Sequence, residues 1–403
     1  MIIKQKIMRG VSLTAHPKGC AQFTQEQFAW VKEAATGTFD KYTTGEAHTY
    51  PKRVLVIGGS TGYGLATRIV AGVLGKADTI NVSFEREPSE KKTATPGWYN
   101  TMAFEQEAHK MGLRADSIQG DAFSHEIKAK TLDLIEKEYG QVDLVVYSLA
   151  SPLRIDPDTG EAYRSVLRTT SETYSAKSID PFKELILVAE VGPATEEQIA
   201  HTVKVMGGED WTLWIKALKE RDLLATGCKT VAYSYIGPEV TFPIYREGTI
   251  GQAKEHLEAT AKELQELLKD IDGAAYVSVN KALVTRASSV IPVVPLYITI
   301  LYRIMKEKDL HEGCIEQMYR LMTERLYQED GVPVDEAGRI RLDDWEMQED
   351  VQTQVQAAWD TIKQENLQQL ADLAGFRNEY EKIHGFGCTD IDYSQECDPR
   401  VID

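Results

Sequence analysis

The sequence predicts an α/β fold, a doubly wound parallel sheet in one large domain with a small added β element and extra C-terminal helices. Over residues 50–150, strand-like apolar runs alternate with helix-like segments. These runs are apolar almost throughout, which is typical of parallel strands that helices cover on both faces. The chain of 403 residues carries no internal repeat, low-complexity tract or Gly/Ser-rich linker that would separate two domains.

The predicted elements follow a regular order up to residue 150 and a looser one beyond it. We expect strands at 53–59, 78–85, 114–122, 142–151, 229–237 and 273–280. We expect helices at 61–75, 98–112, 124–140 and 250–270. Ser124 is the predicted N-cap of the third helix. Residues 154–165 suggest a loop or hairpin, and the chain from about 310 suggests charged helices with a polar tail from about 384.

Composition excludes several classes of function. The net charge of −17 argues against non-specific binding to nucleic acid or to an anionic membrane. The longest apolar run, 290–302, has two prolines and falls short of the about 20 residues that a membrane-spanning helix needs, so we expect no membrane insertion. The N-terminus lacks a signal-peptide core, and five scattered cysteines without CxxC indicate a reducing, cytoplasmic location. No HExxH-like spacing suggests a metal.

A glycine pattern joins the first predicted strand to the first helix. In VIGGSTGYGLATR, the spacing G-x-x-x-G-x-G predicts a cradle for a dinucleotide pyrophosphate at the helix N-terminus. This makes the fold Rossmann-type, and the candidate cofactor residues in the turn are Gly58, Ser60, Gly62, Tyr63 and Gly64.

The ends of the next strands supply further candidate cofactor contacts. The second strand ends in Phe84 and Glu85, and an acidic residue there accepts hydrogen bonds from the adenosine ribose and repels a 2′-phosphate. The cofactor is therefore expected to be NADH rather than NADPH. The third strand ends near Asp121 and Ala122, where the adenine amino group would lie.

The same turn fits a second motif. GGSTG matches G-x-S-x-G, the nucleophile elbow of α/β-hydrolases, with Ser60 as the nucleophile. That elbow normally follows a later strand, and it leaves Gly64 and Glu85 without a role. The dinucleotide interpretation is therefore preferred.

Two later strands end at the expected position of nicotinamide. The fourth strand leads into Ser148, Leu149 and Ala150, which are candidate backbone contacts to the cofactor. The strand at 229–237 brings Tyr233 and Tyr235 to the same edge of the sheet.

A tyrosine and a lysine follow, nine positions apart. On one continuous helix Tyr245 and Lys254 would lie on opposite faces, but Gly248 and Gly251 weaken helix there. We expect Thr249 to cap a helix that starts near Ile250, so that Tyr245 lies on a loop and the two side chains converge.

This pair suits the reduction of an enoyl thioester. Hydride addition at Cβ places negative charge on the thioester oxygen, and the Tyr245 phenol can donate to that oxygen. The Lys254 ammonium would lower the pKa of the phenol and bind the nicotinamide ribose.

The chain resembles the NADH-dependent trans-2-enoyl-CoA reductases and single-chain enoyl-ACP reductases, relatives of the short-chain dehydrogenases. The resemblance runs nearly end to end and includes AHPKGC, TPGWYN, VYSLASPLR, DPDTG, KVMGGEDW, AYSYIGPE, GTIGQAKEHLEAT and SVNKALVTRASSVIPVVPLY. It implies that Tyr245 and Lys254 form the family's Tyr-x8-Lys signature and that Tyr235 is the additional active-site tyrosine. Glu255 stands where many relatives carry a second lysine.

The resemblance implies a single domain, residues 1–403, and we expect three parts within it. Residues of about 50–150 would hold NADH, about 151–310 the substrate and catalytic residues, and 311–403 would be helical. No flavin and no metal are expected. Thr285 would touch the cofactor, and Ile298 and Tyr302 would line the acyl channel; the alternative for 279–305 is a core helix kinked by Pro292 and Pro295.

The sequence leaves open which carrier bears the thioester, and it allows two alternative functions. An enoyl-CoA, such as crotonyl-CoA, and an enoyl-acyl-carrier protein are both expected partners, in fatty acid synthesis or butyrate-type metabolism. The chain is expected to be a monomer or a weak dimer. A carbonyl reductase on the same fold and a non-catalytic NAD-binding sensor are the alternative functions.

Overall fold

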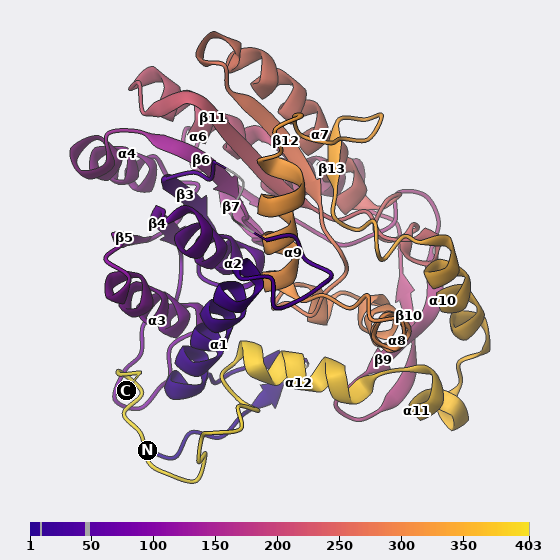
Figure 1. Ribbon diagram of the computed structural model, residues 1–403. Coiled ribbons are helices and arrows are strands. Elements are labelled where there is room, and N and C mark those ends of the chain that lie inside the picture. The colour runs from indigo at the N-terminus through magenta and orange to yellow at the C-terminus, as the bar shows by residue number, and fades with distance from the viewer. Residues whose placement is uncertain (9, 45–48, 403) are drawn as a thin grey trace.

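The computed structural model describes residues 1–8, 10–44 and 49–402, and its centre is a seven-stranded parallel sheet (Figure 1). The strand order is β13-β12-β11-β6-β3-β4-β5, and every neighbouring pair is parallel. The strands are β3 (Arg53–Ile57), β4 (Asp78–Ser83), β5 (Ala115–Gln119), β6 (Val142–Tyr147), β11 (Leu224–Ser234), β12 (Ala274–Val279) and β13 (Arg339–Arg341). The predicted doubly wound sheet is confirmed.

The direction in which the chain builds the sheet reverses between β3 and β6. From β3 the chain proceeds outward through β4 and β5, then returns to β6 on the other side of β3 and continues through β11 and β12. Ile57 and Tyr147, near the carboxyl ends of β3 and β6, are direct neighbours in this pairing. Open α/β sheets bind ligands beyond the carboxyl ends of strands at such a reversal.

Helices cover both faces of the sheet. The helices are α1 (Pro17–Ala35), α2 (Gly62–Val70), α3 (Pro96–Lys110), α4 (His125–Leu134), α5 (Glu196–Met206), α6 (Glu209–Glu220), α7 (Thr249–Leu267), α8 (Val294–Glu307), α9 (Cys314–Arg320), α10 (Glu349–Thr361), α11 (Leu367–Leu370) and α12 (Leu373–Ile383). Short π-helical turns extend α2, α4 and α9. Ser124 caps α4 as predicted, because its side chain accepts a hydrogen bond from the N–H of Ile127.

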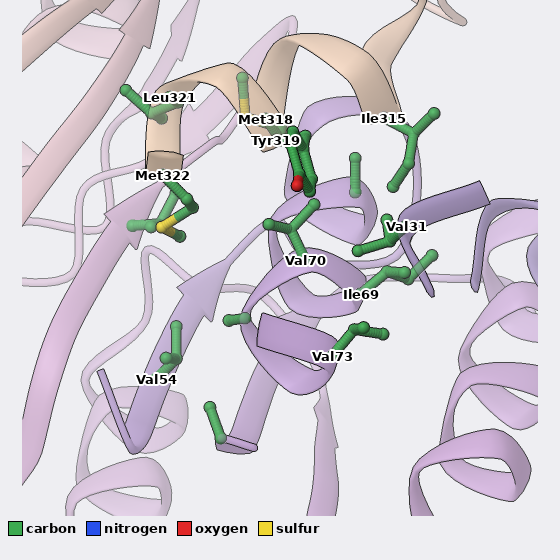
Figure 2. Close-up of a cluster of buried hydrophobic side chains, with 14 of the residues drawn as sticks. Val31, Val54, Ile69, Val70, Val73, Ile315, Met318, Tyr319, Leu321 and Met322 are labelled. Atoms are coloured by element: carbon green, nitrogen blue, oxygen red, sulfur yellow. The ribbon is translucent and has the colours of Figure 1, made fainter. Parts of the chain in front are cut away.

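The two faces of β3 build separate cores. Val54 and Val56 belong to the cluster made with α1, α2 and α9, whereas Leu55 and Ile57 belong to the one made with α4, α6 and α7. This alternation is what a strand period of two dictates. Figure 2 shows the first cluster, in which Ile315, Met318, Tyr319 and Met322 pack over Val31, Val54, Ile69 and Val70.

A third core lies beside the sheet and carries the added β element. The antiparallel hairpin β9 (Tyr174–Asp180) and β10 (Leu185–Val191) packs with α8, α10 and α12, which Figure 1 shows grouped together. A smaller hairpin, β7 (Leu153–Ile155) and β8 (Ala162–Arg164), occupies the segment predicted as a loop or hairpin. Strands β1 (Ile7–Met8) and β2 (Val11–Ser12) pair near the N-terminus. Among the described residues, no helix is both long and apolar enough to cross a bilayer.

The structure corrects three local predictions. The C-terminal part is not helical throughout, because β13 adds an edge strand to the main sheet. Pro292 and Pro295 do not kink a helix, because α8 begins at Val294 and Pro295 lies in its first turn. No hydrogen bond within the helix uses the backbone N–H at that position, so the N–H that proline lacks is not missed. Thr249 is the first residue of α7 rather than its cap, and Gly248 occupies the cap position.

A buried arginine at the end of α9, Arg320, binds the turn after β13. The Arg320 guanidinium donates to both oxygens of Glu312, at 2.7 and 2.9 Å, and to the carbonyl oxygen of Leu342 at 3.0 Å. It also contacts Asp344 and lies 4.0 Å from the centre of the Trp345 ring. The side chains of Arg320 and Glu312 are fully buried, and Arg320 is the member of the pair that joins α9 to residues 342 and 344.

Replacing Arg320 tests how much this contact stabilises the fold. Arg320→Met would leave the Glu312 carboxylate buried without its cation, and we expect the free energy of unfolding to fall by about 3–5 kcal/mol. Urea denaturation measures this loss. The control is Arg303→Met, which breaks an exposed helical pair with Glu307 and is expected to change stability by less than about 0.5 kcal/mol. Equal losses in the two variants would show that Arg320 contributes no more to stability than an exposed arginine.

Candidate active site

Two backbones meet closely in the turn between β3 and α2. Gly58 has φ of 93°, and a Cβ there would lie 2.3 Å from the carbonyl oxygen of Ser148. A Cβ on Gly64 would lie 2.1 Å from the carbonyl oxygen of Gly58, so both positions require glycine. Helix α2 begins at Gly62, and its first N–H groups have no acceptor within the helix. Glycine backbone beside a helix N-terminus fits a pyrophosphate.

The carboxylate of Glu85 lies beside this turn and is already paired. Ser60 Oγ donates to its Oε1 at 2.7 Å, and the Arg286 guanidinium lies 3.3 and 3.4 Å from its two oxygens. The Glu85 side chain is 6% exposed, whereas that of Arg286 is 40% exposed. The charge that was predicted to repel a 2′-phosphate is thus offset by a cation that the sequence analysis did not include. The Ser60 hydroxyl donates its hydrogen bond to Glu85 instead of to a catalytic base. This removes support for Ser60 as the nucleophile of a hydrolase elbow.

Other predicted cofactor residues line the same edge of the sheet. Phe84 follows β4 and is 81% exposed, so its ring offers a flat apolar surface beside Glu85. Asp121 and Ala122 follow β5, and Asp121 Oδ1 accepts a hydrogen bond from the N–H of Phe123 at 3.0 Å. Ser148, Leu149 and Ala150 follow β6, where the N–H of Ser148 donates to the carbonyl oxygen of Ile57 at 2.8 Å. Their contacts to adenine and nicotinamide stay predictions.

Tyr245 lies in a turn that packs tightly against the start of α7. Its N–H donates to the carbonyl oxygen of Thr241 at 2.9 Å, and α7 begins four residues later at Thr249. A Cβ on Gly251 would lie 1.9 Å from the carbonyl oxygen of Arg246 and 2.7 Å from that of Tyr245. Gly251 therefore lets the turn lie on the helix, and Lys254 follows on the second helical turn, as predicted.

The two tyrosines and the lysine gather at the carboxyl end of β11. The rings of Tyr235 and Tyr245 meet edge to face, with 4.9 Å between their centres. Lys254 Nζ donates to the carbonyl oxygen of Tyr233 at 3.4 Å. Tyr233 itself is bound elsewhere, with its hydroxyl 2.5 Å from Thr67 Oγ1 in α2. Tyr235, Tyr245 and Lys254 therefore remain the candidate catalytic residues.

Burial sets the charge states of this group. Burial raises the pKa of Tyr245 to about 12, so its phenol stays protonated near neutral pH. Burial also lowers the pKa of Lys254 to about 8, although the Glu258 carboxylate opposes this shift. The pKa of Tyr245 thus moves in the direction opposite to the one expected from a nearby ammonium. A neutral phenol is a hydrogen-bond donor, which suits stabilisation of a developing oxyanion.

Four remaining predicted residues have structural partners. Tyr63 donates to the carbonyl oxygen of Lys281 at 2.7 Å, and Thr285 exchanges hydrogen bonds with Ser288 in the following turn. Ile298 and Tyr302 are fully buried in α8. The Tyr302 hydroxyl accepts from the N–H of Val284 and donates to Glu379. Their roles toward cofactor and acyl chain stay predictions.

Two residues of this region escaped the sequence analysis. Arg286 pairs with Glu85, and Glu346 accepts a hydrogen bond from the Tyr235 hydroxyl at 3.2 Å. Each joins segments more than 100 residues apart. In the sequence, Glu346 stands in the acidic stretch DDWEM, which has the pattern of a solvated surface.

The chain matches three sequence profiles in succession. Residues 2–90 match the NAD(P)H binding domain of trans-2-enoyl-CoA reductase, and residues 92–327 match the trans-2-enoyl-CoA reductase catalytic region. Residues 334–397 match a profile described as an enoyl reductase FAD binding domain.

The third segment lacks a glycine turn of the kind that holds a dinucleotide. Its glycines are Gly338, Gly375, Gly385 and Gly387, and none of them joins a strand to a following helix. The segment instead adds β13 to the main sheet and packs α10 and α12 on α8. The Gly58 turn, by contrast, has the close backbone approach that a dinucleotide needs. Within the described ranges, no group of three or more His, Cys, Asp or Glu side chains is arranged to hold a metal ion.

Whole-chain comparisons agree with these profiles. The enoyl-[acyl-carrier-protein] reductase [NADH] of Flavobacterium johnsoniae is 54% identical over 100% of this chain and 98% of its own. The protein of the same name from Coxiella burnetii is 52% identical over 98% and 95%. The crystal structure of Treponema denticola trans-2-enoyl-CoA reductase in complex with NAD is 50% identical, with a TM-score of 0.94 over 99% of this chain and 98% of that one.

A second solved structure is similar over its whole length. The Clostridium acetobutulicum trans-2-enoyl-CoA reductase in complex with NADH is 42% identical, with a TM-score of 0.95 over 100% of both chains. Fold, site geometry and these matches lead to one conclusion: the chain belongs to the trans-2-enoyl-CoA reductase family.

Proposed function

We propose that this protein reduces the trans-2 double bond of an enoyl thioester with NADH, giving the saturated acyl thioester. The observation that carries this proposal is the group formed by Tyr235, Tyr245 and Lys254 at the carboxyl end of β11. It lies on the same edge of the sheet as the Gly58 turn, two strands away. The names of the similar relatives and solved structures support both the reaction and the cofactor.

The chain's residues divide the work of this reaction. Bound NADH supplies the hydride that adds to Cβ of the substrate. The charge that this addition places on the thioester oxygen is stabilised by the Tyr245 phenol, which donates a hydrogen bond to that oxygen. Lys254 holds the nicotinamide ribose with its ammonium, and Tyr235 keeps the Tyr245 ring in place through their edge-to-face contact. A proton then adds at Cα and completes the reduction.

We propose that neither flavin nor metal takes part. The segment whose profile names FAD is used to complete the sheet and the third core, and it lacks a glycine turn that could cradle a nucleotide. The Gly58 turn, Glu85 and the exposed ring of Phe84 suit the dinucleotide. The proposed contacts to nicotinamide are Ser148, Leu149, Ala150 and Thr285.

The thioester carrier is proposed to be coenzyme A with a short acyl chain, such as crotonyl-CoA. The net charge of −17 disfavours docking of an acidic carrier protein, although relatives are named for both carriers. Ile298 and Tyr302 are proposed to limit acyl length. We propose a cytoplasmic monomer for this enzyme.

Turnover of crotonyl-CoA tests the proposal directly. We expect rapid loss of NADH absorbance with crotonyl-CoA and little with NADPH or with simple ketones. A protein that binds NADH and reduces ketones but not crotonyl-CoA or crotonyl-acyl-carrier protein would be a carbonyl reductase instead. Binding without any turnover would indicate an NAD-binding sensor.

Removing the phenol of Tyr245 should separate chemistry from cofactor binding. In Tyr245→Phe we expect kcat to fall by about 100-fold or more, because one oxyanion donor is lost. The dissociation constant for NADH, measured by nucleotide fluorescence, should stay unchanged. Tyr163→Phe, in the exposed β7–β8 hairpin, is the control and should keep full activity. Near-normal turnover of Tyr245→Phe would exclude this phenol from the reaction.

Removing the carboxylate of Glu85 should relax the choice of cofactor. In Glu85→Ala the ribose acceptor and its charge are lost, and Arg286 is released from its partner. We expect the ratio of NADPH to NADH affinity to rise at least about tenfold, which corresponds to about 1.4 kcal/mol. Glu87→Ala, two residues further in an exposed position, is the matched control. An unchanged ratio would contradict the ribose role of Glu85.

The charge of Lys254 should make NADH affinity and kcat depend on pH. Because burial lowers the pKa of this ammonium to about 8, its charge is present below that pH and is lost above it. We expect NADH affinity and kcat to decline as pH rises from about 7 to about 9. In Lys254→Arg the charge persists to higher pH, so the decline should disappear from this range. A wild-type profile that is flat across the range would contradict the role.

A further inference from the structure

Glu346 is a fully buried carboxylate in the segment between β13 and α10. Its Oε2 accepts a hydrogen bond from the N–H of Ala282 at 2.7 Å. Its Oε1 accepts two, from the Tyr297 hydroxyl at 2.6 Å and from the Tyr235 hydroxyl at 3.2 Å. Both oxygens are therefore held, and one of the donors is a tyrosine of the proposed active site.

A carboxylate in this position is not explained by packing. Burying a carboxylate is unfavourable unless cations and donors compensate it, and an apolar side chain would fill the same space without that loss. Burial raises the pKa of Glu346 to about 7, opposed first by the Lys281 ammonium and then by the Tyr297 hydroxyl. Lys281 is also buried and donates to the carbonyl oxygen of Ala282 at 3.2 Å. The N–H of Ala282 anchors Oε2, so that Oε1 is directed at the Tyr235 hydroxyl.

Tyr235 is confined on three sides. Its hydroxyl donates to Glu346, and its ring meets Tyr245 at 81°. On the third side is Gly237, where a Cβ would lie 2.8 Å from the Tyr235 hydroxyl and 3.0 Å from the ring. The Tyr235 ring therefore has its orientation fixed by the hydrogen bond at one end and by Tyr245 along its length.

We propose that Glu346 is a positioning residue of the active site, which acts through the hydrogen bond from Tyr235 and thereby fixes the Tyr245 phenol against the thioester oxygen. The segment 334–397 thus completes the catalytic site with a carboxylate instead of binding a flavin. This inference rests on the proposed function. Without the acceptor, the Tyr235 ring is free to turn, and Tyr245 loses the surface that orients it.

Glu346→Gln removes the acceptor and keeps the shape. The amide oxygen must take the N–H of Ala282, so the amide NH2 faces Tyr235 and Tyr297 and offers them a donor in place of an acceptor. We expect kcat for crotonyl-CoA to fall about tenfold, the effect of one misplaced hydrogen bond, with KM within about twofold. The dissociation constant for NADH should not change.

A double-mutant cycle separates positioning from general destabilisation. If Glu346 acts through Tyr235, then Glu346→Gln in a Tyr235→Phe background should lower kcat no further than about twofold. Tyr297→Phe is the matched control, because it removes the shorter hydrogen bond to the same oxygen and leaves Tyr235 in place. It should lower the melting temperature and keep kcat within about twofold of wild type.

Glu346→Asp supplies a second route if the glutamine variant does not fold. It keeps the charge beside Lys281 but shortens the side chain, so it should lower kcat as much as Glu346→Gln does. In a Tyr235→Phe background it should lower kcat no further than about twofold. Two results would overturn the positioning role and leave the proposed function intact. One is a double variant in which the separate decreases in kcat caused by the Glu346 and Tyr235 substitutions multiply. The other is an equal decrease in kcat in Glu346→Gln and Tyr297→Phe. A wild-type protein that reduces no enoyl thioester would overturn the proposed function and this role together.

Discussion

The site depends on the contact between β3 and β6 at Gly58. The carbonyl oxygen of Ser148 occupies the space that a side chain at position 58 would need, so the two strands reach this separation only with glycine there. This contact places the chain's reversal, the N-terminus of α2 and the residues after β6 at one point of the sheet. The tyrosines after β11 lie beside β6 and so share that edge.

The parts of the fold that the sequence predicted are those with a local pattern. The apolar runs of β3, β4 and β6 and the amphipathic α2 and α7 were predicted because strand and helix periods differ. The Tyr-x8-Lys pair was placed correctly on a turn and a following helix. Strand β13 was missed because it has three residues, two of them arginine, and is recognisable as a strand only by its pairing with β12.

The parts that the sequence did not predict depend on distant partners. Gly251 was interpreted as weakening a helix, whereas it lies within α7 and gives the Tyr245 turn room to pack on that helix. The acidic stretch around Glu346 has a surface-like pattern, but it is bound by Arg320 and by the N–H of Ala282. The pKa of Tyr245 depends on its burial against the third core, which no spacing between two residues reveals.

The late position of Glu346 in the chain bears on protein synthesis. Ala282, Tyr235 and Tyr297 leave the ribosome before the carboxylate that joins them, and Glu346 follows Ala282 by 64 positions. At translation rates of about 5–20 residues per second, the delay is roughly 3 to 13 s. During that time α8 has neither α10 nor α12 to cover it, so the nascent chain exposes an apolar helix. Until the C-terminal segment arrives, this helix is the kind of exposed apolar surface that makes an incomplete chain prone to aggregate.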